Sequence, residues 1–178
     1  GCSMIKGLEA AKFGLPFAAF RGPKGSDIVA EAKELYQTVR CPFTGQELTA
    51  IQAIVPDVAI IHAQKADAAG NVQMIGTSAS DLDMAMAAKA VIVTVEEIVP
   101  QLELRPGGVV LPSWAIDAVC VAPGGAHPSY AHGYYDRDNA FYLEWDAISR
   151  DRETFLDWIR AHVLETADVE EYRASLQV

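Results

Sequence analysis

Two apolar runs indicate the fold most clearly, Val58–His62 (VAIIH) and Val91–Val95 (VIVTV). Neither run alternates between apolar and polar residues, which is typical of strands buried on both faces of a parallel sheet. Between them, Ser80 stands three residues ahead of Asp83, which predicts a capped helix through Ala90. A strand, a helix and a strand in this order predict a βαβ unit, and therefore an α/β fold with a mainly parallel sheet.

Weaker signals on both sides of this unit complete the predicted α/β domain. No internal repeat or long linker interrupts the chain, so we expect one domain over residues 1–178. Apolar residues at helical spacing predict helices at residues 4–11, 28–35 (capped by Asp27), 152–163 (led by Asp151) and 169–176. Short apolar runs predict further strands at residues 17–20, 48–51, 72–75, 109–111 and 116–121.

Composition and charge exclude several classes of protein. The chain has 178 residues, of which 51% are hydrophobic and 21% charged, as in soluble globular proteins. Its formal net charge of −10 argues against nucleic-acid binding through a basic surface. No apolar run approaches the ~20 residues of a membrane span, and no secretory signal is visible. We therefore expect a cytoplasmic protein that binds neither nucleic acid nor membrane.

Cysteine and histidine spacing predicts no metal site. Cys2, Cys41 and Cys120 are odd in number and widely spaced, which fits reduced thiols better than a disulfide framework or a zinc site. His127 and His132 are five residues apart and have no neighbouring carboxylate at metal-ligand spacing.

Three segments carry residues suited to chemistry. The turn Gly22–Asp27 leads into a predicted helix, where backbone N–H groups suit a carboxylate or phosphate and Arg21 and Lys24 add positive charge; a plain turn is the alternative. The polar segment His62–Asp67 is predicted just past the end of a buried strand, where α/β sheets bind ligands, although it could equally pin a loop or a subunit contact.

The third segment is Pro123–Tyr135, which combines glycines, two histidines and three tyrosines in a stretch without regular periodicity. Such loops are often functional, as a lid or as a docking loop for a partner. Nucleophilic catalysis by Ser129 with His127 is conceivable but lacks a nucleophile-elbow motif. Glu96-Glu97 follows a predicted strand, where adjacent side chains point apart, so a shared acid–base dyad is not expected.

Several of these stretches together resemble the A (alpha) subunit of family I coenzyme A-transferases, in particular the glutaconate CoA-transferase-like group. The resemblance covers nearly the whole chain. It is carried by Gly14–Phe17 with Arg21 and Gly25-Ser26-Asp27, by Cys41–Gly45 (CPFTG), by Pro56–Asp67 (PDVAIIHAQKAD) with Gly70–Gln73 (GNVQ), by Val91–Val99 (VIVTVEEIV) and by Pro123–Tyr135.

The resemblance implies a Rossmann-like fold of the kind shared by CoA-transferases and NagB, and a covalent mechanism. A glutamate attacks the acyl-CoA thioester, and a glutamyl-CoA thioester then passes coenzyme A to a second carboxylic or dicarboxylic acid. Coenzyme A is a substrate, and no further cofactor is implied. In most of the family the glutamate lies on the B subunit, so the catalytic residue of this chain is unknown. The substrate-side residues carried over are Gly25, Ser26, Asp27, His62 and Gln64.

The family resemblance also implies partners. The matched stretches correspond to the C-terminal portion of an A subunit, and the helix predicted at residues 4–11 has no lead-in, so we expect a preceding segment to be missing or to belong to another chain. The expected partners are the N-terminal half of the A subunit together with a B subunit, often in a heterotetramer, and the chain alone should be inactive. Two alternatives stay open: a CoA-transferase-like hydrolase that opens a ring of a CoA-linked substrate, and a non-catalytic subunit that binds partners.

Overall fold

The computed structural model describes residues 2–22, 26–103 and 108–176. The chain forms two compact units. The first comprises Gly1–Ile61, Thr77–Ile92 and Trp114–Ala118, and the second comprises His62–Gly76, Val93–Ser113 and Val119–Val178. The prediction of one domain over residues 1–178 therefore stays a prediction.

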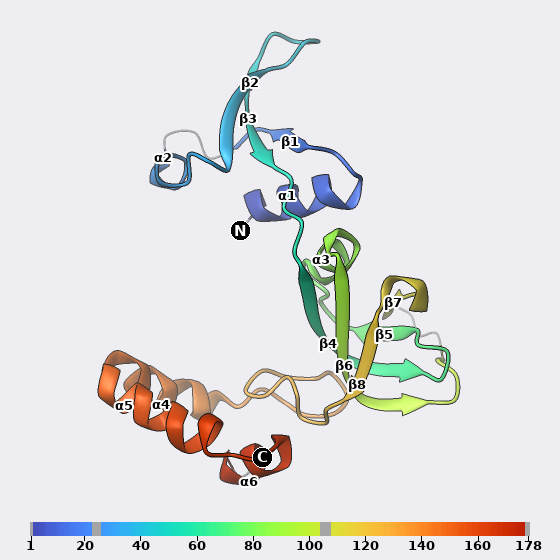
Figure 1. Ribbon diagram of the computed structural model, residues 1–178, viewed down its shortest axis with the longest axis vertical. Helices are drawn as coiled ribbons and strands as arrows, with labels where there is room; N and C mark the ends of the chain where they lie inside the picture. The colour runs from blue at the N-terminus through green and yellow to red at the C-terminus, as the bar shows by residue number, and fades with distance from the viewer. Residues whose placement is uncertain (1, 23–25, 104–107, 177–178) are drawn as a thin grey trace. The chain divides into compact units, whose positions relative to one another are not determined.

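A three-stranded antiparallel sheet lies in the first unit, with the strand order β1-β3-β2 (Figure 1). Its strands are β1 (Phe17–Phe20), β2 (Tyr36–Arg40) and β3 (Glu47–Gln52). Tyr36 pairs with Ile51 in register, and both side chains are buried on the face that α1 (Cys2–Lys12) helps to cover. Gly7 of α1 permits this approach, because a Cβ there would meet the Ile54 side chain at 2.7 Å.

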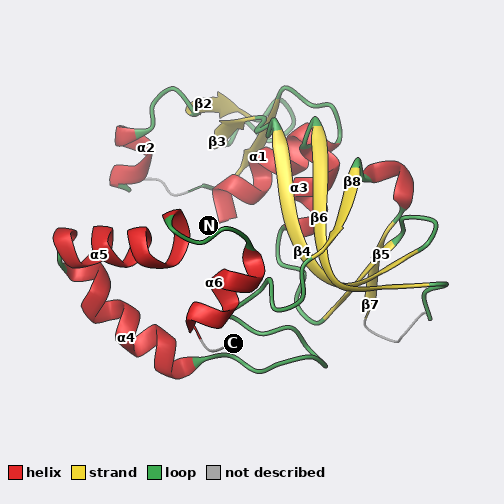
Figure 2. Cartoon of the chain, turned by 60° about the horizontal axis from the view of Figure 1, so that its bottom comes forward, coloured by secondary structure: helices red, strands yellow, loops and turns green. Residues whose placement is uncertain are grey.

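A five-stranded sheet contains the predicted βαβ strands, in the order β7-β5-β4-β6-β8. Its strands are β4 (Val58–Asp67), β5 (Val72–Ile75), β6 (Ala90–Val99), β7 (Gly108–Leu111) and β8 (Ala118–Val121). In Figure 2, β4, β6 and β8 lie side by side. Hydrogen bonds join the beginnings of these three strands, from Lys89 N to Pro56 O and from Asp117 N to Val91 O, so the strands run parallel. The predicted α/β fold with a mainly parallel central sheet and flanking helices is confirmed.

The edge of this sheet is antiparallel, because β4 turns directly into β5. Lys65 pairs with Gln73, and β5 continues the sheet by pairing with β7, Val72 opposite Leu111. The core lies on the face formed by odd-numbered residues of β4 and β6. Its fully or nearly fully buried members include Ala59, Ile61, Ala63, Val91, Val93, Val95, Val72 and Leu111.

The helix that precedes β6 is shorter than the sequence predicts. It is α3 (Asp81–Ala87), and Ala90 already belongs to β6. Ser80 holds the N-cap position, but its side chain makes no capping hydrogen bond, so that part of the prediction is wrong. α3 packs on α1, where Lys12 Nζ lies 3.0 Å from Asp83 Oδ1.

The C-terminal part of the second unit is helical: α4 (Asn139–Arg150), α5 (Arg152–Ile159), a π-helical turn (Arg160–Leu164) and α6 (Val169–Leu176). Aspartates cap the first two helices, since Asp138 accepts from Phe141 N and Asp151 accepts from Thr154 N. The helix led by Asp151 is confirmed, whereas the sequence pattern does not predict α4. A 3-10 turn spans Ser113–Ala115. In the described part of the chain, no helix is long and apolar enough to cross a membrane.

Candidate functional site

The predicted substrate-side turn begins α2 (Asp27–Glu31). Ser26, not Asp27, caps this helix, and its Oγ accepts a hydrogen bond from Ile28 N at 3.3 Å. The helix ends at Glu31 and not at residue 35, because Tyr36 turns into β2 and buries its ring opposite Ile51. Gly25 lies outside the described residues, so binding of a substrate by this turn stays a prediction.

His62 and Gln64 lie inside β4 and not past its end. The prediction that they follow the strand is wrong, because β4 continues to Asp67 through its pairing with β5. The Gln64 amide holds the end of β5: its Nε2 donates to Ile75 O at 3.2 Å, and its Oε1 accepts from Ile75 N at 2.8 Å. Gln64 is 8% exposed, so these bonds form out of water and fix the two strands together.

The Glu96 carboxylate lies at the centre of a buried polar cluster. Its side chain is 3% exposed and accepts three hydrogen bonds. Oε1 accepts from His62 Nε2 at 2.7 Å and from the Tyr135 hydroxyl at 2.8 Å, while Oε2 accepts from Gly124 N at 2.8 Å. Residues 122–138 connect β8 to α4. Glu96 of β6 bonds to Gly124 and Tyr135 of this connection and so holds it against the sheet at two points.

The neighbouring carboxylate, Glu97, has different partners. Lys65 Nζ lies 2.6 Å from Glu97 Oε1, and the Tyr134 hydroxyl donates to the same oxygen at 2.6 Å. Glu97 is 45% exposed at its side chain, in contrast to Glu96. Within the described part of the chain the hydrogen bonds and ion pairs of Glu96 and Glu97 go to different residues, so these adjacent carboxylates point to different partners, as successive residues of a strand do.

Tyr135 and Gly125 complete the attachment of the loop. The Tyr135 hydroxyl also accepts from Ala126 N at 2.8 Å. Burial, followed by the hydrogen bond to Glu96, raises the Tyr135 pKa to about 12, so the phenol keeps its proton and remains a donor. Gly125 lies directly on the His62 ring, because a Cβ on it would be 2.8 Å from both Cε1 and Nδ1.

A hydroxyl, an imidazole and a carboxylate follow one another in this cluster, since His62 Nδ1 lies 2.9 Å from Thr94 Oγ1 and Nε2 faces Glu96. This is the order of groups in a catalytic triad. Here, however, Glu96 is also occupied by the loop, and Gly125 covers the imidazole edge that faces Thr94. The arrangement is thus suited to holding residues 122–138 against the sheet.

His127 and Ser129 are not paired. His127 Nε2 lies 3.3 Å from Asp138 Oδ2, and Nδ1 is buried with no hydrogen-bond partner in the described part of the chain. Neither ring nitrogen therefore contacts Ser129, which removes the geometry that a serine nucleophile would need. Within residues 2–22, 26–103 and 108–176, no group of three histidine, cysteine or acidic side chains could hold a metal ion.

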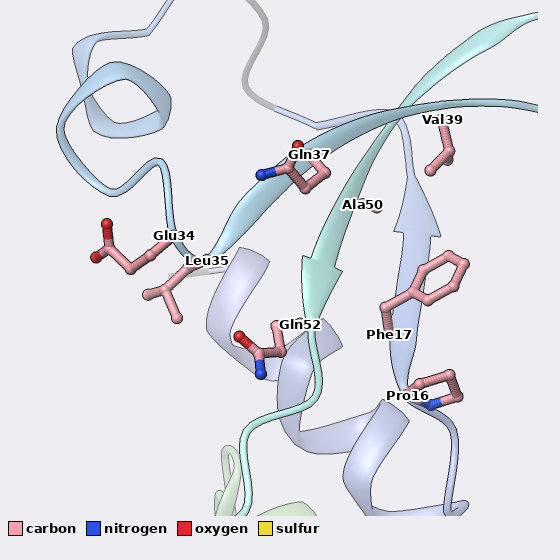
Figure 3. Close-up of a pocket in the computed structure, with 8 residues that line it drawn as sticks. All are labelled: Pro16, Phe17, Glu34, Leu35, Gln37, Val39, Ala50 and Gln52. Atoms are coloured by element: carbon pink, nitrogen blue, oxygen red, sulfur yellow. The ribbon is translucent and has the colours of Figure 1, made fainter.

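The three-stranded sheet carries a second candidate site on its other face. Figure 3 shows side chains of β1, β2 and β3 around an open hollow of about 350 Å³. Phe17, Leu35 and Val39 supply apolar surface, and polar side chains of Gln37 and Gln52 lie at its border. Its volume is within the range of small-molecule sites, and among the described residues that line it Glu34 is the one charged residue.

The contact of Glu97 with Lys65 and Tyr134 predicts a loss of stability in acid. Hydrogen bonds from Lys65 and then from Tyr134 lower the Glu97 pKa, so its folded-state pKa lies below the unfolded value of ~4.3. Stabilisation is then present above the unfolded pKa and is lost as pH falls through the folded one. We expect thermal scans from about pH 5.5 to pH 3 to show a falling Tm. In Glu97→Gln, which cannot titrate there, the fall in Tm should be smaller. An equal fall in both proteins would contradict this.

With this geometry in view, comparison with known proteins identifies the family. The profile of the coenzyme A transferase family matches residues 3–122, which include the whole of the five-stranded sheet and the Glu96 carboxylate. The chain belongs to the coenzyme A transferase family.

Two of the similar proteins are A subunits of CoA-transferases. The A subunit of 3-oxoadipate CoA-transferase from Pseudomonas knackmussii is 50% identical over 167 residues, covering 94% of this chain and 59% of that relative. The A subunit of glutaconate CoA-transferase from Acidaminococcus fermentans is 38% identical, covering 92% of this chain and 57% of that relative. The crystal structure of the glutaconate enzyme matches with a TM-score of 0.85 at 33% identity, over 97% of this chain and 60% of that chain. The chain thus spans somewhat under two thirds of these relatives' length.

Proposed function

We propose that the chain is part of a CoA-transferase A subunit that moves coenzyme A from an acyl-CoA to a small dicarboxylic acid. The observation that carries this proposal is the 50% identity, over 94% of the chain, to a subunit of 3-oxoadipate CoA-transferase. A 3-oxo dicarboxylic acid is accordingly the first acceptor to test. The cytoplasmic location expected from the sequence stays a prediction.

The proposed reaction proceeds through a glutamate of a partner chain. Its carboxylate attacks the thioester carbonyl and releases coenzyme A as a thiolate, leaving an acyl–glutamyl anhydride. The thiolate attacks the glutamyl carbonyl of the anhydride, which releases the first acid and forms the glutamyl-CoA thioester. The acceptor carboxylate and the thiolate then repeat these two steps in reverse and regenerate the glutamate. No other cofactor is proposed, since coenzyme A itself carries the acyl group.

Within this proposal the residues of the chain position the site. Ser26 and Asp27, together with Gly25, which lies outside the described residues, are proposed to face the substrate. For His62 and Gln64 the hydrogen bonds support a different contribution, because His62 is held between Thr94 and Glu96 and Gln64 is bonded to Ile75. We propose that these two act by holding the loop and the edge strand, and that the rest of an A subunit and the B subunit complete the site.

The proposal is tested on the complex that contains this chain. We would purify that complex, identify its chains by native mass spectrometry, and incubate it with succinyl-CoA and 3-oxoadipate. The expected result is a new acyl-CoA of the acceptor acid with matching loss of succinyl-CoA, and no turnover by the 178-residue chain alone. Absence of transfer to any small dicarboxylic acid would overturn the proposal. Full turnover by a complex lacking this chain would instead indicate a non-catalytic subunit.

A hydrolase is the second candidate, because ring-cleaving enzymes are also among the relatives. The IpdA subunit of the cholesterol ring-cleaving hydrolase from Rhodococcus jostii is 28% identical over 98% of this chain. An assay of the same purified complex with a cyclic CoA-linked ketone and no acceptor acid distinguishes the two functions. Ring opening with uptake of water would favour the hydrolase, whereas dependence on an acceptor acid would favour the transferase.

A further inference from the structure

The strand β2 has an edge that can pair with a further strand. β2 lies at one end of the three-stranded sheet, and in the described part of the chain β3 is the strand that it pairs with (Figure 1). Leu35 O accepts from Gln52 N at 3.0 Å, and Cys41 N donates to Gln46 O at 2.8 Å, so the odd-numbered residues bond to β3. Because bonding alternates along an antiparallel strand, the N–H and C=O groups of the even-numbered residues point away from β3.

The sequence of this edge, ELYQTVR over residues 34–40, is complementary to itself in the antiparallel direction. When Gln37 lies opposite Gln37 of a second copy, Glu34 of each copy lies opposite Arg40 of the other. Both charged side chains are exposed, and neither forms an ion pair with a described residue. The same register places the even-numbered residues opposite one another, as hydrogen-bonded pairs require. Opposite charges at both ends favour this register over its neighbours.

Pairing in this register also joins two apolar surfaces. The hollow on the outer face of the three-stranded sheet reaches the β2 edge at Leu35 and Val39 (Figure 3). Leu35 of one copy lies opposite Val39 of the other, and both are odd-numbered, so they share this face. The two hollows, each of about 350 Å³, then become one surface across the twofold axis, and the apolar side chains at the contact leave water.

We propose that two copies of the chain pair through β2, so that their three-stranded sheets form one continuous antiparallel sheet with twofold symmetry. The contact is isologous, because the same residues, 34–40, serve on both sides. One pair of short strands buries less than the ~1,200–2,000 Å² of a stable interface, so the dimer is weak, with a Kd of roughly 10–100 µM. This inference is independent of the proposed CoA transfer, since its test needs no turnover.

Sedimentation equilibrium of the 178-residue chain tests the pairing. Salt at ~0.15 M screens the net charge of −10 on each copy. We expect the mass to rise from 19.2 kDa toward twice that value as the concentration passes through roughly 10–100 µM. A chain that stays monomeric well above this range would overturn the proposal.

Proline variants locate the contact on one edge of the sheet. Thr38→Pro removes an N–H group from the outer edge of β2 and should keep the chain monomeric. Ala19→Pro is the matched control on the opposite edge strand, β1. Pro16 O accepts from Ala53 N, so Ala19 also points its N–H away from β3, and this variant should dimerise like wild type. Circular dichroism checks that both variants fold, and equal dimerisation in both would overturn the proposal.

Charge exchange tests the register without proline. Arg40→Glu and Glu34→Arg each place like charges opposite one another at both ends of the contact, and each should weaken the dimer about ten-fold. An equimolar mixture of these two variants should regain the association of wild type, because every acid again lies opposite a base. A mixture that associates no better than the separate variants would overturn the proposal.

A disulfide locates the twofold axis and identifies the occupant of the edge. Gln37→Cys places two thiols on a non-hydrogen-bonded pair, where Cα atoms are about 4.5 Å apart, a distance that a disulfide spans. The background carries serine in place of Cys2, Cys41 and Cys120. We expect mild oxidation to link Gln37→Cys into a dimer but not Val39→Cys, whose two thiols lie about 13 Å apart along the strands. Equal linking in both, or a link from Gln37→Cys to a different chain of the purified complex, would overturn the proposal.

Discussion

Glu96→Leu should lower the free energy of unfolding by about 3–5 kcal/mol, the largest effect we expect from one substitution. Leucine keeps most of the side-chain volume but removes the acceptor of three buried hydrogen bonds, from His62, Tyr135 and Gly124. Each buried donor left without an acceptor costs about 1–3 kcal/mol. Urea unfolding of the 178-residue chain, followed by circular dichroism, measures the change.

The adjacent position provides a matched control. Glu97→Leu removes a carboxylate from the same strand, but one that is 45% exposed, so its former partners can bond to water. Glu96→Gln should lie between wild type and Glu96→Leu, because the amide oxygen replaces one acceptor. Its N–H can bond to His62 only in the tautomer that carries the proton on Nδ1. Similar losses of stability in Glu96→Leu and Glu97→Leu would contradict the central role of Glu96.

Gly125→Ala is expected to cost about 2–3 kcal/mol, at the upper end for an added methyl group in a packed site. The new Cβ would lie 2.8 Å from two atoms of the His62 ring and 2.9 Å from Ala122 O. Since the ring is held on both sides by Thr94 and Glu96, the loop must move, which strains the bond from Gly124 N to Glu96.

A double-mutant cycle with His62→Ala distinguishes a clash with the His62 ring from a loss of stability that any added methyl group at Gly125 would cause. Once the ring is absent, Gly125→Ala loses its two shortest contacts, those with His62 Cε1 and Nδ1, and should cost less, giving a coupling of at least ~1 kcal/mol. If the two single losses of stability simply add, the His62 ring does not set the position of the loop.

The central sheet can be predicted from the sequence because continuous apolar runs are typical of strands in a parallel sheet. Val58–His62 and Val91–Val95 are such runs, and β4 and β6 contain them. The expected burial on both faces is wrong for β4, since Val58 is 47% and Ile60 69% exposed on the face opposite the core. The three-stranded sheet is only partly predictable. β2 buries Tyr36 but exposes several of its other residues, so its pattern does not distinguish it from the end of the helix expected there. α4 follows a glycine- and tyrosine-rich loop that gives no helical pattern. Its start is marked by the Asp138 cap, whose side chain accepts a hydrogen bond from Phe141 N in the structure.

The polar cluster is less predictable because its members are distant in sequence. The sequence indicates His62 through its place near a strand end and through the family resemblance, and it singles out Glu96 only as the neighbour of Glu97, a pair for which no dyad is expected. The bond between His62 and Glu96 depends on the parallel pairing of β4 with β6, and the bond to Tyr135 depends on the path of residues 122–138. The alternation of Glu96 and Glu97 along the strand is the available signal, since it predicts that their environments differ.

The pairing of Tyr134 with Glu97 and of Tyr135 with Glu96 has a consequence for how the chain finds its alignment. If residues 122–138 slipped by one position along β6, Tyr135 would meet the exposed acid and the buried acid would face a different side chain. Such a slip would place the tyrosine hydroxyl of the buried site beside a solvent-exposed acid. It would also leave buried hydrogen-bonding groups without a matching partner. Two successive acids on one strand therefore select a single alignment for a connection that has no regular structure of its own.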